Sequence, residues 1–198
     1  MNTQNPNASG GRLQRPAAVD GAHISTFRQV VYRHGLAMGS MALVLALLPS
    51  AYDQVARTTT RFLDNPAAYM LAGALLLTFF IVYQNRKGYR RSARNNLWLI
   101  YLLYISVVEE LAFRLFLPIG LADAIHFYAA AFVSNVIFAA VHYVTLRWRW
   151  QNCVFVFVGG MGFAHMLASH QDIIAVILAH WFFTFLNTPA PPAGCRKA

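Results

Sequence analysis

The chain has 198 residues, of which 58% are hydrophobic and 12% charged, and its mean hydropathy is +0.44. This composition departs from that of soluble globular proteins toward that of membrane proteins, and the length predicts one domain. A net charge of +9 would suit a nucleic-acid-binding protein, but the cations flank the expected helix ends, which is typical of topology and anionic-lipid signals. We therefore expect a lipid bilayer as the surroundings and no nucleic-acid partner.

Residues 1–34 are polar, and we expect a flexible cytoplasmic tail that can become helical near Phe27–Tyr32. The first apolar segment that follows is better explained as an anchored helix than as a signal peptide, because its polar leader is too long. No segment has the alternating pattern of a barrel strand. We predict an all-α, polytopic membrane helical bundle over residues 35–188, followed by a short cytoplasmic tail at 189–198. About six transmembrane helices are expected, at roughly 35–51, 66–84, 97–117, 125–146, 150–168 and 172–188.

The distribution of basic residues predicts the orientation, because cytoplasmic loops collect Lys and Arg. If the N-terminus is inside, the inside segments contain 13 of the 16 cations, whereas the outside loops contain Arg57 and Arg61 and Arg114 is within the membrane. We expect a multi-pass protein of the inner (plasma) membrane with both termini in the cytoplasm. The inside cations are Arg12, Arg15, Arg28, Arg33, Arg86, Lys87, Arg90, Arg91, Arg94, Arg147, Arg149, Arg196 and Lys197.

Three ionisable residues, Glu109, Glu110 and Arg114, interrupt the apolar segment 97–117. Each charge at mid-bilayer depth costs about 2.5–3.5 kcal/mol, so these side chains must face protein or trapped water. Glu110 and Arg114 have the i, i+4 spacing of an ion pair, which leaves Glu109 free for another role. A purely structural network that clamps neighbouring helices is the simpler alternative, although clamping rarely requires two adjacent carboxylates.

Two later segments carry polar stripes. Asn135, Phe138 and His142 share one helix face, and His180, Thr184 and Asn187 share another. Either histidine alone is equally well explained by an interhelical hydrogen bond. Together with Glu109, however, they predict a shared polar chamber to which three helices each contribute a protonatable group. A carboxylate and an imidazole can activate water, and an imidazole can stabilise an oxyanion, so this chamber could hydrolyse an amide bond without a Ser or Cys nucleophile.

The motifs Glu109-Glu110-x-x-x-Arg114 and Phe138-x-x-x-His142, a Gly-containing fifth helix and the final His180 resemble the CPBP family. This family, also called ABI, comprises CAAX-prenyl proteases and bacteriocin-processing proteins, and the resemblance covers about residues 97–188. It implies a glutamic-type intramembrane protease in which Glu109 activates a water with His142 as its partner. Glu110 and Arg114 would maintain the geometry and charge of the site, and His180 would face the oxyanion.

The resemblance leaves the metal question open, because both glutamic-type and metalloprotease descriptions are used for the family. We expect no cofactor, with zinc bound by Glu109, His142 and His180 as the alternative. One position departs from the family pattern, which has Asn or Asp four residues after the last histidine, where this chain has Thr184. Asn187, on the same stripe, could substitute for the missing amide.

The sequence therefore predicts an intramembrane endopeptidase that hydrolyses a peptide bond of a membrane-anchored protein or peptide. Its substrate would be a C-terminal sorting signal, a processed peptide or a prenylated tail. The alternative is a non-catalytic membrane scaffold or a bacteriocin self-immunity protein on the same fold, which Thr184 favours. A third candidate, a proton-coupled carrier, is disfavoured because the chain has no internal repeat.

Overall fold

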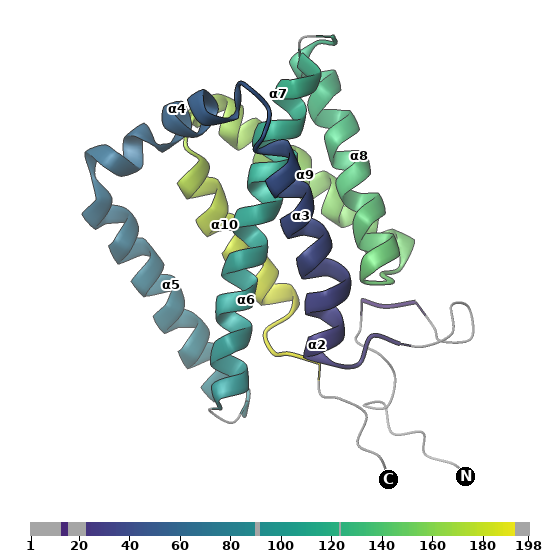
Figure 1. Ribbon diagram of the computed structural model, residues 1–198. Coiled ribbons are helices and arrows are strands. Elements are labelled where there is room, and N and C mark those ends of the chain that lie inside the picture. Colours follow the sequence, from purple (N-terminus) through teal and green to yellow (C-terminus); the bar gives the residue numbers. More distant parts are fainter. Residues whose placement is uncertain (1–12, 16–22, 90–91, 123, 193–198) are drawn as a thin grey trace.

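The computed structural model describes residues 13–15, 23–89, 92–122 and 124–192, and these form a helical bundle (Figure 1). Its first rod consists of α2 (Phe27–Val30), the π-helical η1 (Val31–Gly35) and α3 (Leu36–Leu45). Thr26 and Gln29 form a capping box at the start of this rod, in which each side chain binds the backbone N–H of the other's residue. The helices α4 (Ala51–Asp64) and α5 (Pro66–Arg86) follow.

The second half of the chain contains the rest of the bundle. A central rod runs through α6 (Ala93–Glu110), η2 (Leu111–Phe116) and α7 (Leu117–Ala122), and then come α8 (Phe127–Thr145), α9 (Trp150–His170) and α10 (Ile173–Asn187). Asp172 caps α10 by accepting a hydrogen bond from the N–H of Ala175. The central rod contacts α3 and α10, whereas α8 packs between α7 and α9.

The predicted all-α membrane bundle is confirmed. Among the described residues, three helices are long and apolar enough to cross a membrane, namely α5, α8 and α9, and α10 is a shorter apolar helix. Most apolar side chains of α5 are exposed and only Phe80 among them is fully buried, as expected where lipid is the solvent. Where α5 does contact the bundle, the Phe80 ring stacks on Phe185 at a centroid distance of 4.0 Å and packs edge-on against Trp181.

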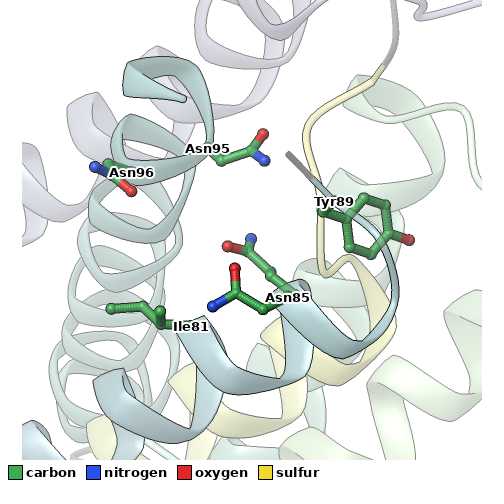
Figure 2. A pocket seen from close by; sticks show the side chains of 6 residues that line it. Ile81, Asn85, Tyr89, Asn95 and Asn96 are labelled. Atoms are coloured by element: carbon green, nitrogen blue, oxygen red, sulfur yellow. The ribbon is translucent and has the colours of Figure 1, made fainter. Parts of the chain in front are cut away.

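Basic residues gather at the helix ends on one side of the bundle. In Figure 1, α2, α6 and α9 begin at the lower end of the bundle, where α5, α8 and α10 finish. We call this the basic end, because the expected inside cations of the described residues flank it, namely Arg15, Arg28, Arg33, Arg86, Lys87, Arg94, Arg147 and Arg149. A pocket of about 270 Å³ lies there between α5 and α6 (Figure 2). Its lining contains amides such as Asn85 and Asn95 but no carboxylate or imidazole.

The helix expected near Phe27–Tyr32 is present, because α2 begins at Phe27 and continues without a break through η1 into α3; residues 1–12 and 16–22 of the expected tail lie outside the described part. Residues 52–64, expected to be a connecting loop, belong instead to the amphipathic helix α4, on which Ala51 and Thr58 are buried and Arg57 and Arg61 are exposed. Such a pattern is typical of helices that lie in the membrane interface.

Candidate active site

The acidic pair Glu109 and Glu110 closes α6 where the helix widens into the π-helical turn η2. A π-turn leaves backbone groups without their usual partners, and it is a frequent feature of functional sites. Here the hydroxyl of Ser134, on α8, donates to the carbonyl of Phe113 at 2.6 Å. A side chain of a neighbouring helix therefore stabilises the distortion that orients the two carboxylates.

Glu110 and Arg114 form the ion pair expected from their spacing, with 3.4 Å between Oε2 and Nε. Both side chains are almost completely buried, which makes the attraction between them stronger than at a surface. The guanidinium also lies over the ring of Phe138, 4.0 Å from its centroid. The motif residue Phe138 thus contributes a π face that covers the buried cation.

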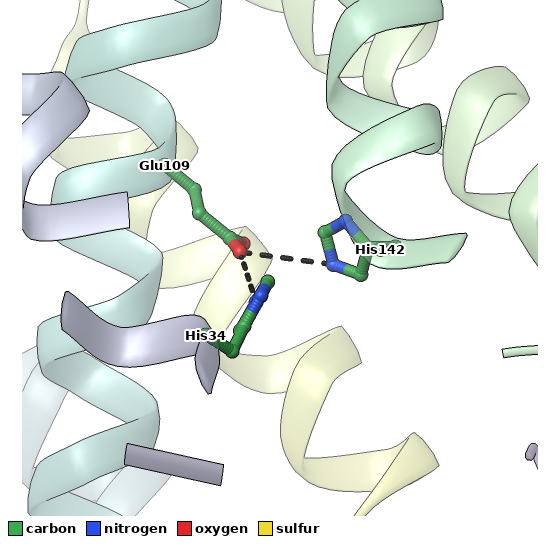
Figure 3. A group of neighbouring side chains, drawn as sticks. All are labelled: His34, Glu109 and His142. Carbon is green, nitrogen blue, oxygen red and sulfur yellow. Dashed lines mark hydrogen bonds and ion pairs between the residues drawn. The ribbon is translucent and has the colours of Figure 1, made fainter. Parts of the chain in front are cut away.

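Glu109 lies among three imidazoles from three separate elements. Its Oε1 atom is 2.8 Å from Nε2 of His34 and 3.7 Å from Nε2 of His142, as Figure 3 shows. Its Oε2 atom is 3.5 Å from Nε2 of His180. All four side chains are buried. The structure therefore brings together the three residues to which the sequence assigned catalysis, Glu109, His142 and His180.

The other ring nitrogen of each histidine has its own hydrogen-bond partner. Nδ1 of His142 donates to the Phe138 carbonyl at 2.9 Å, and Nδ1 of His180 lies 2.5 Å from Oε1 of Glu110. Nδ1 of His34 lies 2.8 Å from the hydroxyl of Thr145. These contacts orient all three rings so that each Nε2 faces Glu109. Glu110 therefore pairs with Arg114 and also orients His180.

His34 is the residue of the site that the sequence interpretation missed. It was assigned to the flexible tail, yet it is buried in η1 and makes the shortest contact with Glu109. Its ring also packs edge-on against His142, at a centroid distance of 4.8 Å. One signal could have found it, because His34 directly precedes the first apolar run, where the chain enters the bundle.

A close contact between α8 and α9 lies against the buried ion pair of Glu110 and Arg114. The side chain of Asn135 bonds the Ala131 carbonyl and faces the backbone of Gly160, on α9. A Cβ atom at Gly160 would lie 1.9 Å from Oδ1 of Asn135 and 2.7 Å from a terminal nitrogen of Arg114. Only glycine therefore lets α9 approach the buried ion pair this closely.

A cavity of about 1970 Å³ connects the histidine cluster with the basic end. Glu109, His142 and His180 line its inner part, and Thr184 and Asn187 lie along the same wall. His142 occupies the last turn of α8, and the chain leaves α8 at Leu146, which also lines the cavity.

The donor set can also be compared with a metal centre. Among the described residues, the ligand atoms of His34, Glu109 and His142 all lie within 4.8 Å of one another. Zinc ligands in a tetrahedral site are about 3.3 Å apart, so small side-chain shifts would fit an ion here. This compact set contains His34 where the sequence interpretation had His180. The 2.8 Å contact between His34 and Glu109 is equally that of a hydrogen bond with a shared proton.

Comparison with known proteins identifies one family. The model of the Rce1-like family, type II CAAX prenyl endopeptidase Rce1-like, matches residues 93–186. The matched region begins with α6 and ends in α10, so it contains Glu109, His142 and His180, whereas His34 precedes it. No curated protein and no solved structure matches the chain.

Proposed function

We propose that the chain, whose residues 93–186 match the Rce1-like CAAX endopeptidase model, is an intramembrane endopeptidase of the CPBP family. The observation that carries this proposal is the convergence of three imidazoles on the buried carboxylate of Glu109, within a cavity that reaches the basic end of the bundle. A carboxylate surrounded by imidazoles is equipped for proton transfer. The family supplies the reaction class, hydrolysis of a peptide bond.

Water activation is proposed for Glu109 and His142. The 3.7 Å between Nε2 of His142 and Oε1 of Glu109 is long for a direct hydrogen bond and suits a bridging water. Since Nδ1 of His142 donates to a backbone carbonyl, Nε2 presents a lone pair that accepts a hydrogen bond from the water, while Glu109 takes the other water proton. The water oxygen then attacks the scissile carbonyl carbon.

The oxyanion site is proposed at His180. For Nε2 to donate to an oxyanion, this ring must have protons on both nitrogens, and the carboxylates of Glu110 and Glu109 balance the charge of such an imidazolium. When the tetrahedral intermediate collapses, the proton held by Glu109 passes to the leaving nitrogen and the C–N bond breaks. The products are a free amine and a new carboxylic acid, which keeps the second water hydrogen until it ionises in solution, and Glu109 is ionised again.

Thr184 lies one turn beyond His180 on the cavity wall and would supply a hydroxyl donor where the family pattern has an amide. A single hydroxyl stabilises an oxyanion less than two donors do, by about 1–3 kcal/mol. Asn187 lines the same wall and is the proposed substitute. If neither side chain contributes, the fold would serve as a non-catalytic membrane scaffold or a self-immunity protein, which is the second candidate function.

We place the substrate at the membrane, as a C-terminal sorting signal, a processed peptide or a prenylated tail of a membrane-anchored protein. Entry from the basic end follows from the course of the cavity. By the distribution of Lys and Arg this end faces the cytoplasm of a cell whose inner membrane contains the protein. No resident cofactor is part of the proposed reaction.

The test is a panel of membrane-anchored peptides from these three classes, incubated with the purified protein in liposomes and analysed by mass spectrometry. We expect at least one class to be cut at a single peptide bond, and His142→Ala to abolish that cut while leaving the helical circular dichroism unchanged. If His142→Ala cuts as the wild type does, the water-activating role is wrong. If no class is cut, the scaffold function is favoured.

A further inference from the structure

A short segment before the first helix is paired with the connection between α8 and α9. The N–H of Arg15 donates to the carbonyl of Arg147 at 2.8 Å, and the N–H of Arg149 donates to the carbonyl of Leu13 at 2.9 Å. These two bonds flank an antiparallel bridge between Gln14 and Trp148. We call residues 13–15 the paired segment and the backbone of residues 147–149 the docking edge.

The docking edge lies next to the histidine cluster, that is, the three imidazoles around Glu109. Gln14 and Trp148 form a pair of the type that exchanges no hydrogen bonds itself, so their side chains project from the same face. The Trp148 ring is 5.0 Å from that of His142, between centroids. A residue paired with Trp148 therefore projects on the face that carries His142, and the paired segment lines the same cavity as Glu109.

The backbone of the paired segment takes part in four anchoring hydrogen bonds, and the side chains of Gln14 and Arg15 add bonds to the backbone of Ile24 and Tyr143. The side-chain amide of Asn152 donates to the carbonyl of Leu13 at 2.9 Å, and Nε of Arg149 donates to the carbonyl of Gln14 at 3.1 Å. Together with the two bonds of the bridge, these contacts do not depend on the side chains of the segment. Any extended peptide could make them, which is the mode by which exposed strand edges recognise peptides.

The docking edge also requires a partner. Its backbone is non-helical and borders the cavity, and Arg147 and Trp148 are half-buried, so their N–H and C=O groups are costly to leave unpaired where water is excluded. Arg147 adopts a left-handed conformation with φ of 55°, a strained state for a residue with a side chain. The chain thus maintains a strained edge beside its histidine cluster and covers that edge with an extended segment of its own.

We propose that the docking edge is the binding site for the extended backbone of the peptide substrate, and that the paired segment occupies it as an internal competitor. This inference rests on the proposed peptidase function and adds how the substrate is recognised. The substrate displaces residues 13–15, pairs with residues 147–149 and presents a carbonyl to Glu109. Recognition is then largely independent of side chains at the paired positions, and the competing segment lowers activity toward weakly bound peptides.

A reversible crosslink tests this directly. In a background with Cys153→Ala and Cys195→Ala, the pair Gln14→Cys and Trp148→Cys places two thiols at directly opposed positions, within the range of a disulfide. We expect oxidation to reduce cleavage of the best peptide at least tenfold and dithiothreitol to restore it. The reduced protein is its own control for the loss of the Trp148 ring. If no disulfide forms, or if the crosslinked protein cuts as fast as the reduced one, the inference is wrong.

A second pair of variants tests the docking edge and the paired segment independently. Arg15→Pro removes one N–H of the paired segment and leaves the docking edge intact, so kcat/KM should rise three- to tenfold. In that background, Arg149→Pro removes an edge N–H at a residue whose φ of −64° already suits proline, and kcat/KM should fall about tenfold relative to Arg149→Ala. Unchanged kcat/KM in both comparisons refutes the inference alone, whereas a wild type that cuts no peptide refutes the peptidase function.

Discussion

Replacing His34 by alanine should impair turnover although the residue lies outside the family motifs. Its Nε2 makes the shortest contact with Glu109, and its Nδ1 contacts Thr145, whose own hydroxyl donates to the Val141 carbonyl at 2.6 Å. Because that hydroxyl proton is already used, Nδ1 of His34 must be the donor to Thr145. A second proton therefore lies in the contact between Nε2 of His34 and Oε1 of Glu109, where the imidazole and the carboxylate share it.

The size of the effect follows from the bond that is lost. A hydrogen bond to a charged group contributes about 1.5–3 kcal/mol, and the one from His34 positions the carboxylate to which we assign the activation of water. If the whole of this stabilisation is lost from the transition state, kcat falls about 10- to 150-fold. KM should change much less, because the proposed contacts with the peptide backbone lie at residues 147–149.

The assay is steady-state cleavage of a peptide in liposomes by the wild type, His34→Ala, His34→Gln and His165→Ala. His165 is exposed on α9 and serves as the control, which should retain wild-type kinetics. The amide of His34→Gln can still donate to Glu109, so it should recover part of the lost kcat. If His34→Ala, verified as folded by its thermal unfolding, keeps a wild-type kcat, then the cluster does not act through His34.

Three further outcomes follow from the buried network. Gly160→Ala should lower the free energy of unfolding by about 1–3 kcal/mol, because its Cβ would overlap Asn135, whereas Gly159→Ala, with nothing within 4 Å of its Cβ, should be neutral or stabilising in the same thermal unfolding measurement. Glu110→Ala should cost about 3–5 kcal/mol in that measurement, because it leaves the buried Arg114 without its counter-charge; a loss below 1 kcal/mol would show that the pair is not desolvated. Cleavage should persist in EDTA and in protein whose metal content, measured by mass spectrometry, has been depleted, because a shared proton accounts for the short contact between Glu109 and His34. Loss of cleavage on chelation and its recovery with zinc would favour the metal centre instead.

The sequence predicted the core of the site because its residues are costly where they lie. Glu109, Glu110 and Arg114 interrupt an apolar helix, and such charges are retained only for a purpose. The i, i+4 rule then predicted the pairing of Glu110 with Arg114, which the structure shows at 3.4 Å. The same cost argument identified His142 and His180, which lie in apolar helices and both face Glu109.

The missed features depend on tertiary contacts that leave little local signal. His34 follows a polar stretch, and its burial arises only when the first rod packs beside the end of α8, where Thr145 meets it. The helix α4 has a mixed composition, and its amphipathic pattern lacks the continuous apolar run that indicates a membrane-spanning helix. The bridge between Gln14 and Trp148 joins residues far apart in the chain, so no local pattern could predict it.

The most direct test of the proposed hydrolysis is the rate at which Glu109→Gln cuts a peptide that the wild type cuts, in liposomes and with equal thermal stability of the two proteins. Glutamine keeps the size of the side chain and its contacts with the histidines but cannot accept the water proton. We predict that cleavage falls at least a thousandfold, about 4 kcal/mol in the activation free energy. Cleavage by Glu109→Gln within tenfold of the wild-type rate would contradict the role of Glu109 as the group that activates water.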